Sequence, residues 1–192
     1  NPSRVWTGST NFTEAGLYLQ TNLGIVIEEA EIAGAFDRYF DLLKQDLETR
    51  EMKSEVARLV QQVTAQMPQH KELYLSPVSS TRLLDAAAQV INQAQAAVFI
   101  SCPFGLEQRI TTALNNNDGR VVEYGLVNKS SSKRLRAALT RNNNTWFAAP
   151  AELPHYLKQE WDAEVRGVAR RHEIHVKSLV TDPWSARPTI LI

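Results

Sequence analysis

The chain has 192 residues, 43% hydrophobic and 22% charged, a composition typical of one globular domain or most of one. Basic and acidic residues balance at 21 each, so no net positive charge attracts nucleic acid, and a polyanion would need a local patch. A single cysteine, Cys102, excludes an internal disulfide and a cysteine-based metal cluster. No apolar run approaches the roughly 18 residues of a membrane span.

The chain opens with a predicted strand and turn over residues 4–12. Ser9 and Asn11 lie two apart after Gly8, so in an extended chain their side chains share one face. Such small polar groups can donate to a phosphate or orient a histidine. The alternative is an ordinary loop, because Gly-Ser-Thr-Asn is also common turn sequence.

Two helices are expected next. Residues 23–28 predict a buried strand, and from Glu31 to Leu43 apolar residues recur every three or four positions, which predicts a helix that packs on a sheet. The pattern continues amid many charges from residue 51 to 67, which predicts a second, more exposed helix.

From residue 72 onward, short apolar segments alternate with helical patterns. The expected strands cover residues 73–75, 96–101, 120–127 and 145–149, and the expected helices cover 82–91, 106–114 and 131–139. A short helix over 154–161 and a turn at 164–167 precede the last strands, one of which starts at Thr189. This alternation predicts an α/β fold, with a mostly parallel sheet flanked by helices in an α-β-α sandwich. Cys102 follows the apolar run 97–100, which predicts a buried thiol.

His175 and Lys177 lie two apart in an apolar run near the end of the chain. In a strand this spacing points both side chains to one face, so an imidazole and an ammonium share one patch. The imidazole can act as nucleophile or acid–base group, and the ammonium can hold a phosphoryl oxygen. Taken alone, a histidine in an apolar strand is more often a packing or surface residue.

The spacing H-x-K-x-x-x-x-D, formed by His175, Lys177 and Asp182, resembles the signature of the phospholipase D superfamily. Gly8, Ser9 and Asn11 resemble the G-S-x-N element that follows each such motif in that family. The order is reversed here. The resemblance therefore implies the internal portion of a two-repeat protein, with both ends cut: residues 1–67 would close the first repeat and carry a linker helix, and 68–192 would form most of the second.

The resemblance implies a phosphodiesterase that uses no metal and no other cofactor. In that family one motif histidine attacks phosphorus to form a phosphohistidine, the other protonates the leaving oxygen, and water resolves the intermediate. By motif position, His175 is one of the two histidines and Lys177 a phosphate clamp. Gly8, Ser9 and Asn11 would bind phosphate or position a histidine, and Asp182 completes the catalytic motif as a structural or orienting acid.

Three questions stay open at this stage. The phosphodiester substrate is a phospholipid or a nucleic acid, and the sequence does not separate them. The His and Lys of the first repeat and the G-S-x-N of the second are not among these residues. Flanking segments or a second chain would have to complete the site; otherwise the chain is a noncatalytic scaffold or interaction fragment that retains half of it. The cellular location is not indicated.

Overall fold

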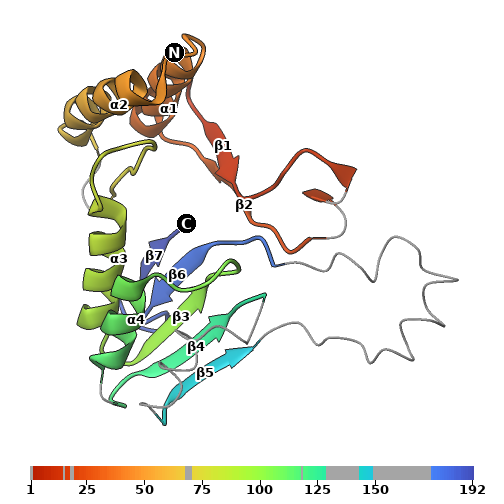
Figure 1. Cartoon of the computed structure of the whole chain (residues 1–192), viewed down its shortest axis with the longest axis vertical. Coiled ribbons are helices and arrows are strands. Elements are labelled where there is room, and N and C mark those ends of the chain that lie inside the picture. Colours follow the sequence, from red (N-terminus) through yellow and green to blue (C-terminus); the bar gives the residue numbers. More distant parts are fainter. Residues whose placement is uncertain are drawn as a thin grey trace, which may run out of the picture. The chain divides into compact units, whose positions relative to one another are not determined.

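The computed structural model describes residues 2–14, 16–17, 20–67, 71–117, 119–128, 143–148 and 174–192. In chain order the elements are β1 (Val5–Gly8), β2 (Gly24–Ile27), α1 (Ala30–Leu43), α2 (Thr49–Thr64), α3 (Arg82–Gln93), β3 (Ala97–Ser101), α4 (Gln108–Asn115), β4 (Val122–Leu126), β5 (Thr145–Ala148), β6 (Ser178–Thr181) and β7 (Thr189–Leu191) (Figure 1). The α/β class is confirmed. The predicted helices at 131–139 and 154–161 and the turn at 164–167 lie outside the described residues.

The chain divides into two compact units. Unit 1 contains Asn1–Thr7 and Gly24–Leu83, and unit 2 contains Gly8–Leu23 and Leu84–Ile192. The first unit therefore extends past residue 67, where the sequence places the repeat boundary. Residues 8–23, which the sequence assigns to the first repeat, belong to unit 2 in this division, and the predicted repeats themselves stay a prediction.

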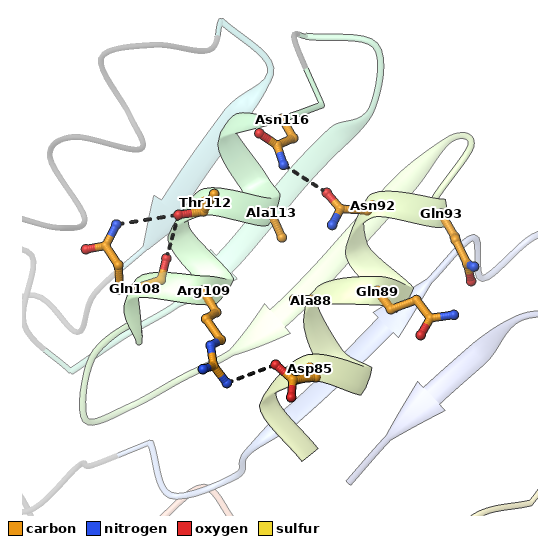
Figure 2. A pocket seen from close by; sticks show the side chains of 10 residues that line it. All are labelled: Asp85, Ala88, Gln89, Asn92, Gln93, Gln108, Arg109, Thr112, Ala113 and Asn116. Carbon is orange, nitrogen blue, oxygen red and sulfur yellow. Dashed lines mark hydrogen bonds and ion pairs between the residues drawn. The ribbon is translucent and has the colours of Figure 1, made fainter. Parts of the chain in front are cut away.

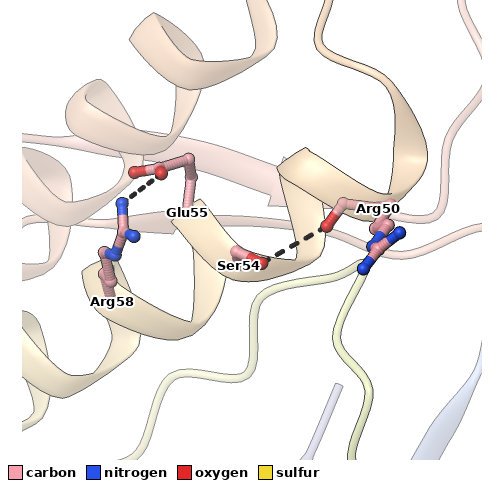
Figure 3. Close-up of polar contacts among 4 residues, drawn as sticks. All are labelled: Arg50, Ser54, Glu55 and Arg58. Carbon is pink, nitrogen blue, oxygen red and sulfur yellow. Dashed lines mark hydrogen bonds and ion pairs between the residues drawn. The ribbon is translucent and has the colours of Figure 1, made fainter.

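Unit 1 is centred on a pair of helices, α1 and α2, that pack against each other. Its buried apolar residues form one cluster: Ala35, Met52, Val56, Leu59, Val63 and Leu75. The α1 helix was expected to pack on a sheet, but it packs against α2. The α2 helix was expected to be the more exposed of the two, and it buries only a stripe at three- and four-residue spacing with its charged residues turned outward. On this outer face Arg58 pairs with Glu55, and the Ser54 hydroxyl donates to the Arg50 carbonyl at 3.4 Å (Figure 3).

In this unit one predicted strand does not form, and another forms but is not buried as predicted. Residues 73–75 form no strand. Leu75 is buried in the core between the helices, so the apolar pattern of this segment reflects packing against helices rather than pairing in a sheet. The β2 strand was expected to be buried, yet its residues alternate between exposed and half-buried, and Val26 is 58% exposed. Among the described residues it pairs with β1 alone, in a two-stranded sheet.

Unit 2 is built on a five-stranded sheet in the order β5-β4-β3-β6-β7. The β3–β4 and β4–β5 pairs are parallel, whereas β3–β6 and β6–β7 are antiparallel. The sheet is therefore mixed rather than mostly parallel. Helix α4 makes the crossover that a parallel β3–β4 pair requires, but a short loop joins β6 to β7, so these strands pair as a hairpin.

The described helices of unit 2, α3 and α4, cover one face of this sheet (Figure 1). Val98 and Ile100 of β3 point toward them, and the core beneath includes Ile91 and Leu114. The opposite face carries a row of aromatic side chains. Phe99 stacks on Tyr124 with ring centroids 5.7 Å apart, Tyr124 stacks on Trp146 at 5.2 Å, and Trp184 meets Phe99 edge-on at 5.7 Å.

Candidate functional site

His175 and Lys177 lie in the extended segment immediately before β6, and both contact the ring of Phe104. The imidazole meets that ring edge-on, with centroids 5.6 Å apart and an interplanar angle of 82°. The Lys177 ammonium lies over it, 5.1 Å from the centroid. It also donates to the His175 carbonyl at 3.1 Å. As the alternating pattern predicts, both motif side chains occupy one patch.

The backbone of this segment is held from two other parts of unit 2. The Thr21 carbonyl accepts hydrogen bonds from the N–H groups of His175, at 2.9 Å, and Val176, at 3.0 Å. On the other side, the buried Ser101 hydroxyl at the end of β3 donates to the Val176 carbonyl at 2.8 Å. The imidazole is therefore carried on a backbone with little freedom to shift.

Asn128 gives a third anchor, directly after β4. Its carboxamide Nδ2 donates to the Ile174 carbonyl at 3.1 Å, and its Oδ1 accepts from the Ile174 N–H at 2.9 Å. Its own N–H donates to the Pro103 carbonyl at 3.2 Å, which ties it to the loop after β3. The motif segment therefore lies at the carboxyl ends of the parallel strands, where open α/β sheets commonly bind ligands.

The G-S-x-N turn is built around Ser9. Its N–H donates to the Leu23 carbonyl at 2.9 Å, and its Oγ accepts from the Leu23 N–H at 3.1 Å. The hydroxyl then donates to the Asn22 Oδ1 at 3.0 Å, while the Asn22 Nδ2 donates to the Gly16 carbonyl at 2.8 Å. Because its hydroxyl hydrogen is engaged, Ser9 in this arrangement orients the Asn22 carboxamide.

Residues 21–23 link the two motifs. Leu23 bonds to Ser9 on one side, and Thr21 bonds to the backbone of His175 on the other. Asn11 lies exposed in the same loop as Ser9. Gly16 allows this loop to close, because a Cβ at that position would clash with the Asn11 carbonyl.

Asp182 lies at the opposite end of β6 from His175. Its Oδ1 accepts from the N–H groups of Ala96 and Ala97 at 2.7 and 3.0 Å, and its Oδ2 accepts from that of Gln95 at 2.9 Å. Burial acts to raise the pKa of Asp182, but the donors of Ala97, Gln95 and Ala96 outweigh it and hold the pKa below its usual value. Asp182 therefore holds the backbone at the start of β3 and lies away from His175, so its expected role as a structural or orienting acid stays a prediction.

Cys102 lies next to the motif patch. It is half-buried, and its thiol donates to the Gly105 carbonyl at 2.6 Å. Burial raises the pKa of Cys102, against a smaller opposing effect of the Lys177 charge. The thiol is therefore mainly a packing group, although it is less buried than the sequence predicts.

A hollow of ≈ 560 Å³ lies elsewhere, between α3 and α4 (Figure 2). Its walls are mostly amide and small side chains, crossed by an ion pair of 2.9 Å between Arg109 and Asp85. No residue of either motif lines it, so we place the candidate site at the His175 patch rather than in this hollow.

The described part of the chain contains no group of three or more His, Cys, Asp or Glu side chains that could hold a metal ion. Within the same residues, no helix is both long and apolar enough to cross a membrane. No protein-family model and no curated protein matches the chain.

Several residues of this patch were not predicted from the sequence: Thr21, Ser101, Phe104 and Asn128. For Ser101 and Asn128 a signal was present, because each is a polar residue at the end of a predicted strand. The carboxyl ends of parallel strands meet at one edge of a sheet, so polar groups there are candidates for a site. Thr21 acts through its backbone carbonyl, which no sequence pattern indicates.

Proposed function

We propose that the chain belongs to a phospholipase D-like phosphodiesterase, in which His175 and Lys177 carry one half of the chemistry. One observation supports this above all: the G-S-x-N turn and the H-x-K segment, far apart in the sequence, are joined within unit 2 through residues 21–23. A chance match of two short motifs gives no reason for them to meet in space. The α/β class agrees with this assignment.

In the proposed reaction, an imidazole nitrogen attacks phosphorus, a P–N bond forms and the P–O bond to the leaving group breaks. A second histidine protonates the leaving oxygen, and water then cleaves the P–N bond to restore the imidazole. Lys177 neutralises the nonbridging oxygens by charge-assisted hydrogen bonds. His175 acts as one of the two histidines. The other, with its lysine, would come from flanking sequence or from a second chain.

Hydrolysis of bis(p-nitrophenyl) phosphate by the chain, with and without a chelator, tests the proposal. We expect chelation to change nothing and His175→Asn to lower the rate on the order of 100- to 10,000-fold. His70→Asn, at a histidine outside both motifs, is the matched control and should keep the wild-type rate. Activity that survives His175→Asn would refute the proposal.

The alternative is a noncatalytic scaffold, and it is favoured by the presence of only one H-x-K pair in these 192 residues. Absence of hydrolysis by the wild-type chain would support this alternative. It would be overturned if adding a segment with a second H-x-K pair restored turnover that depends on His175.

A further inference from the structure

We propose that Phe104 is a positioning residue that holds the imidazole of His175 and the ammonium of Lys177 in their working orientation. This inference rests on the proposed function. Phe104 lies in the loop between β3 and α4, and its side chain is 69% exposed, so the hydrophobic core does not account for it. Its contacts instead include the two charged or titratable groups of the H-x-K motif.

An aromatic ring suits both contacts for different reasons. The face of the ring carries partial negative charge, which attracts the Lys177 ammonium lying over it at 5.1 Å. A perpendicular arrangement, here at 82° with the His175 ring, brings the positive edge of one ring to the negative face of the other. An aliphatic side chain of similar volume offers no quadrupole, so it would fill the space without orienting either group.

The loop that carries Phe104 is itself well anchored. The Gly105 N–H donates to the Cys102 carbonyl at 3.1 Å, and the Pro103 carbonyl accepts from the Asn128 N–H at 3.2 Å. Gly105 adopts a φ of 115°, a conformation that favours glycine, and so allows the tight turn after the ring. Asn128 also bonds to the backbone of Ile174, next to His175. The same residue therefore anchors both the loop that carries Phe104 and the segment that carries His175.

Three variants of the full chain separate positioning from stability. Phe104→Leu removes the ring, and Phe104→Tyr keeps it. Phe40→Leu removes another largely exposed ring, in unit 1, which is 59% exposed and has the Lys44 ammonium 5.6 Å from its centroid. For bis(p-nitrophenyl) phosphate we expect Phe104→Leu to lower kcat on the order of 10- to 100-fold with a smaller change in KM, because misplaced catalytic groups mainly slow the chemical step. Phe104→Tyr and Phe40→Leu should stay within about threefold of wild type.

A second readout needs no activity. In NMR spectra the His175 ring protons should show a ring-current displacement that Phe104→Leu abolishes and that the other two variants keep. If the wild-type chain does not hydrolyse the diester, the proposed function fails, and this spectrum alone decides whether Phe104 holds the imidazole. Unchanged His175 resonances in Phe104→Leu, or an equal loss of kcat in Phe104→Leu and Phe40→Leu, would overturn the inference.

Discussion

Asp182 can be tested without any substrate, because its carboxylate binds three backbone N–H groups at the start of β3. Asp182→Asn removes the charge and leaves one acceptor oxygen for these three donors. A hydrogen bond to a charged group contributes about 1.5–3 kcal/mol. Water can replace part of this because most of these bonds are exposed, so we expect a loss of about 1–2 kcal/mol in the free energy of unfolding at pH 7.

The assay is urea unfolding of wild type and variant across pH. Burial acts to raise the pKa of Asp182, but the backbone donors lower it on balance, so the folded pKa lies below the unfolded value. The stabilisation is then complete above the unfolded pKa and is lost as the pH falls through the folded pKa. The difference between wild type and Asp182→Asn should therefore shrink below about pH 4.

Asp46→Asn is the matched control, because Asp46 also has a left-handed backbone, with φ of 49° against 48° for Asp182, and is exposed. Asparagine tolerates that backbone conformation as well as aspartate does, so backbone strain cancels from the comparison. We expect the control to change the free energy of unfolding by less than about 0.5 kcal/mol. Equal losses for the two variants, or a loss at Asp182 that does not depend on pH, would refute this account of the carboxylate.

Two further substitutions test a hydrogen bond and a packing contact in unit 2. Asn128→Ala should lower the free energy of unfolding in urea by about 1–3 kcal/mol and speed hydrogen exchange at the Ile174 N–H, which loses its acceptor. Unchanged protection of this N–H would show that Asn128 does not anchor the segment. Gly125→Ala should cost about 1–3 kcal/mol, because the new Cβ would clash with the Phe147 ring. Gly34→Ala is the control, because a Cβ at this position of α1 meets open space, and it should raise the free energy of unfolding by about 0.5–1 kcal/mol. Equal changes in stability for Gly125→Ala and Gly34→Ala would refute the predicted clash.

Most of the described helices and strands could be predicted from the sequence, because local periodicity records which face of each element is buried. The pairing of the strands could not. Alternating strands and helices favour parallel neighbours, which holds for β3, β4 and β5. The antiparallel position of β6 beside β3 is a long-range choice, set by how the whole sheet covers its core, and no local pattern encodes it.

At the candidate site, sequence spacing predicted that His175 and Lys177 share a patch, because two residues is the period of an extended chain. It could not predict what holds them. Thr21 acts through a carbonyl and Phe104 through an exposed ring from another loop, so both contributions exist only after folding. Ser9 was predicted to bind phosphate or to orient a histidine, whereas its bonds in the described residues are to Asn22 and Leu23, so both predicted roles stay predictions.

The spacing of the H-x-K-x-x-x-x-D motif has a structural explanation here. The four residues between Lys177 and Asp182 are Ser178–Thr181, the whole of β6. The strand places His175 and Lys177 at one end of the sheet and the Asp182 carboxylate at the other. There the Asp182 N–H donates to the Ala97 carbonyl at 2.9 Å, which extends the hydrogen bonding between β3 and β6. A shift of one residue would turn the carboxylate to the other face of the sheet. The four-residue interval between the lysine and the aspartate of the motif is therefore the length of β6, which begins beside the candidate site and ends at Asp182.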